Sequence, residues 1–192
     1  MPRPLTLALA LLAAASLAVA CTRASDATAP AVAHGSHVSQ NVNRPSFGEP
    51  SPEVLRDLAR VRQATAQFHR IEVAKQAKWD AKLTECFSDP QGGMGYHYGN
   101  MDLFDGTVSV SEPELLLYEP QKDGKLELVA VEYAIPFTAW PSAAPPQLFG
   151  RAFHRNEVFG LWILHVWVHR DNPSGMFEDW NPKVSCQYAP KS

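Results

Sequence analysis

Two cysteines, Cys86 and Cys186, bracket most of the aromatic and apolar sequence that could form a core. A disulfide between them would close a loop of about 100 residues, which the chain-entropy model values at about 4–5 kcal/mol. Such a pair is typical of domains that fold in an oxidising compartment. Free thiols are the alternative, although neither cysteine has neighbours that would activate it. We therefore predict a Cys86–Cys186 disulfide.

The first 20 residues have the features of a signal peptide. Arg3 precedes an apolar run from Leu5 to Ala20, which ends in the small-residue motif Ala18-Val19-Ala20. This pattern is typical of export, and the run is too short for a stable transmembrane helix. We predict a signal peptide over 1–20 and a protein located in the periplasm or at the cell surface.

Cys21 would become the first residue after cleavage. The segment from Leu17 to Cys21 resembles a bacterial lipobox, except that Ala18 stands at the position where leucine is usual. Cys21 is therefore the predicted lipidation site, and a lipid anchor there is the one membrane contact we expect. Cleavage after Ala20 by an ordinary signal peptidase is the alternative.

Composition predicts one modest domain behind this leader. Residues 21–50 are rich in Ala, Ser, Thr and Pro, which predicts a disordered tether. Residues 51–190 have the length of a single domain. The chain has 17 Lys and Arg against 20 Asp and Glu, a formal net charge of −3. Without a basic stripe interleaved with aromatic residues, nucleic acid is not an expected partner.

Apolar periodicity predicts a helix followed by strands. Ser51, Pro52 and Glu53 form a helix start, and apolar residues then recur at helical spacing, which predicts one long amphipathic helix over 52–82. Asp123-Gly124 predicts an antiparallel hairpin. The predicted fold class is α+β, with the long N-terminal helix packed on a bent antiparallel sheet or half-open barrel. The strands are predicted, from their branched and aromatic residues, over 96–100, 114–119, 126–134 and 161–169.

Each of these strands places an ionisable residue where a purely structural strand would have Val or Leu: His97, Glu119, Glu132 and His165. A buried imidazole or carboxylate is costly unless it is paired or bound to a metal. If the faces that carry them converge, the four would suit Zn²⁺, Fe²⁺, Mn²⁺ or Cu²⁺. The same set could bind a polar small molecule or act as general acid and base. A structural role, with hydrogen bonds inside the core, is the third interpretation.

Several motifs give the chain a resemblance to a known family. Together they resemble a family of exported bacterial proteins whose function is uncharacterised. The resemblance covers about residues 60–187, including all four candidate site residues, and it implies an exported domain of helix and sheet but no reaction. The motifs are Gly92-Gly93-Met94-Gly95-Tyr96-His97, Leu115-Leu116-Leu117-Tyr118-Glu119-Pro120, Gly124-Lys125-Leu126, Val131-Glu132-Tyr133, Leu164-His165-Val166-Trp167, Asn172-Pro173-Ser174-Gly175-Met176-Phe177, Trp180-Asn181-Pro182 and Cys186.

The favoured hypothesis is an exported, lipid-anchored binding protein with a metal or small-ligand site inside the sheet. His97 and His165 would supply nitrogen ligands and Glu132 a carboxylate, with Glu119 as a fourth ligand or a supporting partner. A metal-dependent enzyme of hydrolase or oxygenase type is the first alternative, because the same residues could activate water or oxygen. A structural or interaction protein of the cell envelope is the second.

Overall fold

The computed structural model describes residues 50–190. The predicted signal peptide, nearly all of the predicted tether and the predicted lipidation site Cys21 lie outside these residues. Within the described part of the chain, no helix combines the length and the apolar character needed to cross a bilayer.

The first helix is much shorter than predicted. Helix α1 (Pro52–Thr65) is capped by Ser51, whose hydroxyl accepts a hydrogen bond from the Val54 N–H at 3.3 Å. A 3₁₀ turn, η1 (Ala66–His69), and a short helix, α2 (Ile71–Gln76), follow it. A single helix over 52–82 is therefore a wrong prediction.

The break has a physical cause in the packing of η1. In a continuous helix, the Phe68 carbonyl would accept from the N–H four residues later. Here it accepts instead from the Tyr118 hydroxyl at 2.7 Å, and the Arg70 backbone is extended, with φ −95° and ψ 111°. Burial of Phe68 against the sheet thus replaces helical continuation.

The described chain is mostly sheet, which corrects the predicted α+β class with its long helix. Seven strands form one sheet in the order β1-β3-β4-β5-β9-β8, with β2 also paired to β3, and β6 (Gln147–Leu148) pairs separately with β7 (Arg151–Ala152). Every pairing is antiparallel. A further 3₁₀ turn, η2 (Met101–Leu103), follows β3. The strands of the large sheet are β1 (Ala81–Lys82), β2 (Phe87–Asp89), β3 (Gly92–Gly99), β4 (Leu115–Pro120), β5 (Leu126–Pro136), β8 (His154–Asn156) and β9 (Leu161–Val166).

The hairpin predicted at Asp123-Gly124 is confirmed as the β4–β5 pair. Its register shifts once: Leu117 lies opposite Ala130, but Tyr118 lies opposite Leu128. Such a bulge adds one residue to β5, so the residues on its two sides exchange faces. Simple alternation along the strand predicts that Leu128 lies on the same face as Glu132. Because of the bulge, Leu128 packs on the opposite face, in the cluster that contains Tyr118.

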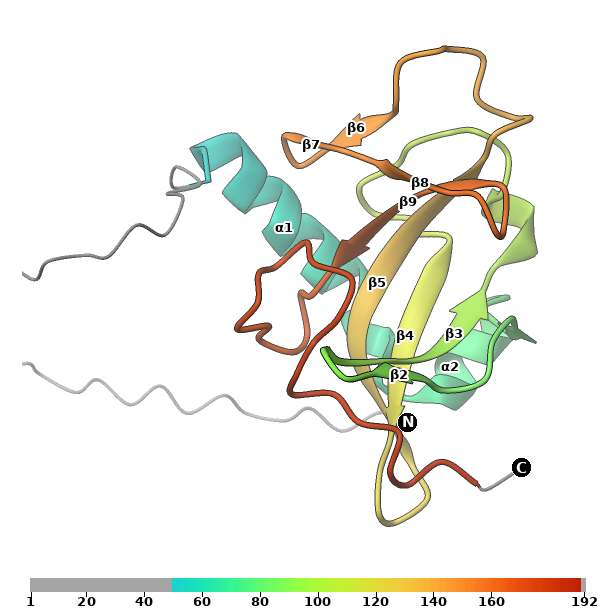
Figure 1. The fold of residues 1–192 in the computed structure, drawn as a ribbon, viewed down its shortest axis with the longest axis vertical. Helices are drawn as coiled ribbons and strands as arrows, with labels where there is room; N and C mark the ends of the chain where they lie inside the picture. The colour runs from blue at the N-terminus through green and yellow to red at the C-terminus, as the bar shows by residue number, and fades with distance from the viewer. Residues whose placement is uncertain (1–49, 191–192) are drawn as a thin grey trace, which may run out of the picture. The chain divides into compact units, whose positions relative to one another are not determined.

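Both faces of the sheet are apolar, and α1 covers one of them (Figure 1). On that face, Leu58 and Val61 of α1 pack in one cluster with sheet residues that include Tyr118 and Tyr133. The opposite face carries a second cluster formed by Leu115, Leu117, Val129, Ala130, Ala134, Ile163, Trp167 and Val184. The candidate site lies on this second face.

The C-terminal segment is tied back to the start of the sheet. Cys86 and Cys186 form the predicted disulfide, with a Cα–Cα distance of 5.8 Å. Gly93 and Asn181 exchange backbone hydrogen bonds of 3.0 and 3.1 Å. A Cβ atom on Gly92 would lie 2.3 Å from the Asn181 carbonyl carbon, so this close approach requires glycine. The residues after β9 are thereby held against β3.

Candidate metal centre

The strand register brings three of the four predicted site residues together. His97 on β3 lies opposite Leu117 on β4, whereas Glu132 on β5 lies opposite both Leu115 and His165. Residues opposite each other on one face have Cβ atoms about 5 Å apart. His165 is therefore a direct neighbour of Glu132, and His97 reaches the same carboxylate across β4.

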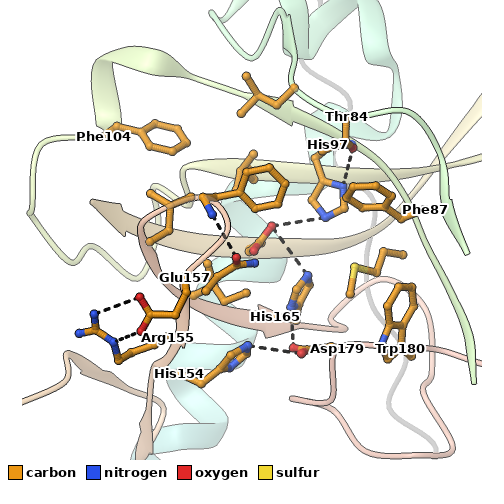
Figure 2. A pocket seen from close by; sticks show the side chains of 18 residues that line it. Thr84, Phe87, His97, Phe104, His154, Arg155, Glu157, His165, Asp179 and Trp180 are labelled. Atoms are coloured by element: carbon orange, nitrogen blue, oxygen red, sulfur yellow. Dashed lines mark hydrogen bonds and ion pairs between the residues drawn. The ribbon is translucent and has the colours of Figure 1, made fainter. Parts of the chain in front are cut away.

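The side-chain atoms of this group converge on one small volume (Figure 2). Oε2 of Glu132 lies 3.4 Å from Nε2 of His97 and 3.7 Å from Nε2 of His165. One ligand atom from each of the three residues lies within 4.8 Å of the others. Two ligands roughly 2.1 Å from a tetrahedral ion lie roughly 3.4 Å apart. The His97–Glu132–His165 group could hold a metal ion.

All three side chains are buried, with exposed fractions of 6% for His97, 7% for Glu132 and 1% for His165. Nε2 of His165 has no hydrogen-bond partner, and it is the one buried side-chain polar atom within residues 50–190 of which this is true. Leaving a buried polar atom unsatisfied costs about 1–3 kcal/mol. A ligand at this nitrogen would remove that cost.

Each histidine is oriented through its other ring nitrogen. Nδ1 of His165 lies 3.0 Å from Oδ1 of Asp179, and Nδ1 of His97 lies 3.0 Å from the Thr84 hydroxyl. The second oxygen of Asp179 lies 3.3 Å from Nε2 of His154 (Figure 2). A carboxylate that accepts from Nδ1–H leaves the Nε2 lone pair of His165 for a metal ion, which is the usual arrangement at metal-binding histidines.

Burial and the neighbouring charges shift the pKa values of the three residues in different directions. Burial, followed by the proximity of His165, lowers the pKa of His97 to about 3, so this imidazole is neutral and retains its lone pair. Burial also raises the pKa of Glu132, which His165 partly offsets. For His165, burial is the largest influence and lowers the pKa, but Glu132 and the hydrogen-bonded Asp179 together outweigh it and raise the pKa.

Glu119 does not join the group, which corrects the four-residue cluster. Its Oε1 accepts from the Ser185 N–H at 2.8 Å, and its Oε2 lies 3.0 Å from the Arg170 guanidinium. Glu119 shares a face with Leu117 but is two residues farther along β4, roughly 7 Å away. It lies opposite Glu127 there, and Arg170 contacts that carboxylate as well at 2.8 Å. Glu119 anchors the C-terminal segment.

Three residues beside the group were missed by sequence reasoning: Thr84, His154 and Asp179. Thr84 and Asp179 lie outside any strand and His154 lies in a three-residue strand, so no periodicity marks them. For Thr84 and Asp179, the available signal was nearness in sequence to the disulfide. Thr84 precedes Cys86, and Asp179 precedes Cys186, so a cross-link between the cysteines brings both segments to one edge of the sheet.

The His97–Glu132–His165 group lines a cavity of about 760 Å³. A volume of this size is typical of small-molecule sites, which take ligands in clefts of roughly 300–1,000 Å³. Asp179 and His154 also line it, and Arg155, Asn156 and Glu157 add a second polar stretch of the wall. The remaining wall is largely apolar and includes Met94, Phe104, Leu115, Ile163 and Trp180.

Comparison with known proteins assigns no role to these residues. The resemblance to exported bacterial proteins stays a prediction, and the chemistry of the site has to be inferred from its own donor atoms. No protein-family model, curated protein or solved structure matches the chain.

Proposed function

We propose that the protein binds one divalent transition-metal ion through His97, Glu132 and His165, and uses this ion to hold a small molecule in the adjoining cavity. The observation that carries the proposal is the buried, unpartnered Nε2 of His165 beside the Glu132 carboxylate. A purely structural histidine would be expected to have a partner at both ring nitrogens. A bound cation gives this nitrogen a partner and neutralises the buried carboxylate.

The donor set narrows the choice of ion. Two imidazole nitrogens and one carboxylate suit first-row transition metals, whereas Ca²⁺ and Mg²⁺ prefer oxygen ligands. We propose Zn²⁺, because two histidines and one glutamate with an open fourth position form a common zinc set. Zn²⁺ also needs no reductant in the oxidising compartment that the disulfide favours. Fe²⁺ is the next candidate, since two histidines and a carboxylate also bind non-haem iron.

The proposed setting is outside the cytoplasm. The Cys86–Cys186 disulfide supports an oxidising environment, and the signal-peptide features of residues 1–20 support export. Attachment to a membrane through a lipid on Cys21 is part of the same proposal. The partners would be a metal ion and a small molecule, and nucleic acid is not among them.

One observation favours a second candidate function, a metal-dependent enzyme of hydrolase or oxygenase type. The three protein ligands face a cavity rather than a closed core. Catalytic metal sites keep a coordination position free for water or substrate, whereas structural sites fill every position with protein ligands. Turnover of a small molecule would then be added to its binding.

The test is metal titration of protein prepared without a histidine tag and treated with a chelator. We expect one Zn²⁺ per chain by calorimetry and elemental analysis, and loss of that ion in a His97→Ala/His165→Ala double variant. Glu132→Gln should weaken binding strongly. Glu119→Gln is the matched control, because it makes the same change on the same face outside the group. Folded protein that takes up no stoichiometric metal would overturn the proposal.

A further inference from the structure

We infer that the cavity takes an amphiphilic ligand, with an apolar body and one monoanionic oxygen-donor head such as a carboxylate or hydroxamate. The inference rests on the proposed metal site, which would bind the head. It goes further by assigning the chemical class of the ligand from the cavity walls, from the mouth and from the charge inside.

The inner walls can contact an apolar body. Leu115 and Ile163 project from the second face of the sheet, beside Glu132 and His165, and are 4% and 5% exposed. Phe104 and Trp180 extend this surface with aromatic rings (Figure 2). Burying hydrocarbon against such walls contributes about 0.8 kcal/mol for each CH₂ group. A ligand that lay only on the metal would leave this surface unused.

Part of the mouth of the cavity is apolar, beside the exposed Arg155–Glu157 ion pair. Leu83, Phe87 and Phe159 line it and remain 44%, 37% and 55% exposed. They come from segments far apart in sequence, the β1–β2 region and the β8–β9 hairpin. Single exposed apolar side chains are common on protein surfaces. Several such side chains around one opening indicate a binding site. The apolar surface thus continues from the buried end of the cavity to its rim.

Charge limits the head group. A divalent ion bound by Glu132 keeps one positive charge, which one monoanion would neutralise. The guanidinium that lines the cavity, Arg155, already lies 2.6 Å from Glu157 and 3.9 Å from the ring centroid of Phe137. Among the described lining residues, no other Arg or Lys is present. Phosphates and nucleotides would therefore find no cation beyond the metal that is not already paired with a carboxylate.

Most polar groups of the lining are already engaged with one another, which leaves few to bind a sugar: His154 pairs with Asp179 and Arg155 with Glu157. Asn156 accepts the Phe159 N–H at 3.2 Å, and the Thr84 hydroxyl is engaged with His97. Polyhydroxylated ligands need several hydrogen-bond partners to replace the water that they lose. An apolar acid needs partners at its head alone, and this is the chemistry that the cavity can satisfy.

The experiment compares two probes with one head group, octanohydroxamate and acetohydroxamate, on the full mature chain loaded with Zn²⁺. Calorimetry should give at least about tenfold tighter binding of the longer probe, because about two buried CH₂ groups suffice for that ratio. Metal-free protein should bind the longer probe at least about tenfold more weakly, because the head has lost its partner.

Two exposed residues provide a matched pair of variants. Phe159→Ser at the mouth should reduce the preference for the longer probe several-fold. Leu55→Ser is the control, because Leu55 is 54% exposed, as against 55% for Phe159, and lies on α1, outside the cavity lining. Both positions are exposed enough to tolerate serine without loss of the fold.

The outcomes separate this inference from the metal proposal, because Zn²⁺ content is measured on the same samples. Equal affinity for the two probes on zinc-loaded protein would overturn the apolar ligand and leave the metal site standing. Equal binding of octanohydroxamate with and without zinc would overturn the assignment of the head to the ion. Failure to retain zinc would overturn both proposals together.

Discussion

At the scale of single residues, His165 is the side chain whose surroundings most need a ligand. Its Nδ1 is held by Asp179 at 3.0 Å, while its Nε2 is buried without a hydrogen-bond partner. The Asp179 carboxylate therefore fixes the ring so that Nε2 points toward Glu132. Asp179 itself is 35% exposed, so its role is to orient the histidine from the edge of the cavity.

Asp179→Asn should weaken zinc affinity by about 10- to 100-fold while one ion per chain still binds at saturation, as is typical when a partner of a metal-binding histidine is changed. Competition with a chromogenic chelator measures this. Glu178→Gln, one residue earlier, is the control and should change nothing. An unchanged affinity in Asp179→Asn would show that the carboxylate does not orient His165 for metal binding.

From the burial of Glu114 we predict a pH dependence of stability. The residue is 1% exposed, and burial raises its pKa to about 8, although its hydrogen bond from the Ala134 N–H opposes this shift. A carboxyl whose pKa is higher in the folded state binds its proton more tightly there. Its contribution to stability is therefore full below the unfolded pKa of about 4.5 and is lost as the pH rises to about 8.

Glutamine at this position keeps an acceptor for the Ala134 N–H and cannot ionise. Glu114→Gln should therefore be more stable than the native protein at about pH 9, by at least about 1 kcal/mol, while the difference shrinks or reverses near pH 5. Urea unfolding of both proteins at the two pH values measures this difference. Parallel pH profiles would show that Glu114 does not titrate in this window.

At the scale of elements, the antiparallel ladder explains which site residues meet. Alternation along 96–100, 126–134 and 161–169 singled out His97, Glu132 and His165, and the strand register places them on one face. The same alternation also singled out Glu119. Alternation predicts the face on which a side chain lies, but it does not predict how far along the neighbouring strand that side chain lies. Glu119 lies opposite Glu127, beyond the group, and that register depends on the hairpin and its bulge.

The helix shows a different limit of sequence reasoning. Apolar spacing continues past residue 65, so nothing in the pattern marks an end at Thr65. The end is set by tertiary contacts: the Tyr118 hydroxyl donates to the Phe68 carbonyl, and the Thr65 hydroxyl lies 2.8 Å from Nε2 of His169. Thr84 and Asp179 were missed for a related reason, because loop residues acquire their neighbours only through the folded chain.

Glu119 gives a prediction at this scale, since it joins β4 to the C-terminal segment. Glu119→Ala removes the acceptor of the Ser185 N–H and a partner of Arg170, and should lower the free energy of unfolding by about 1–3 kcal/mol. Glu127→Ala is the control: it removes a contact to the same guanidinium, but Glu127 is 45% exposed, so its loss should cost about 1 kcal/mol or less. Equal costs in the two variants would contradict this assignment.

At the scale of the whole molecule, the disulfide joins the two segments that orient the metal group. Thr84 lies just before Cys86, and Asp179 lies in the stretch that Cys186 and the Gly93–Asn181 bridge hold against β3. The covalent link thus connects overall stability with the geometry of the site. The predicted cysteine pairing was accessible from sequence, and it carried a signal for Thr84 and Asp179 that alternation along the strands does not contain.

A Cys86→Ser/Cys186→Ser double variant should lose about 2–5 kcal/mol of unfolding free energy, as is usual for a native disulfide. Its zinc affinity should also fall, because the segments that hold His97 and His165 become less constrained. Urea unfolding and chelator competition measure the two effects. A variant that loses stability but keeps full zinc affinity would show that the disulfide does not support the site.

The most direct test of the metal centre is an anomalous-difference map at the zinc edge, from crystals of the zinc-loaded protein. The account predicts one strong peak about 2.0–2.2 Å from Nε2 of His97, Nε2 of His165 and a carboxylate oxygen of Glu132. A map with no peak between these three side chains, or with zinc bound only at surface residues, would contradict it.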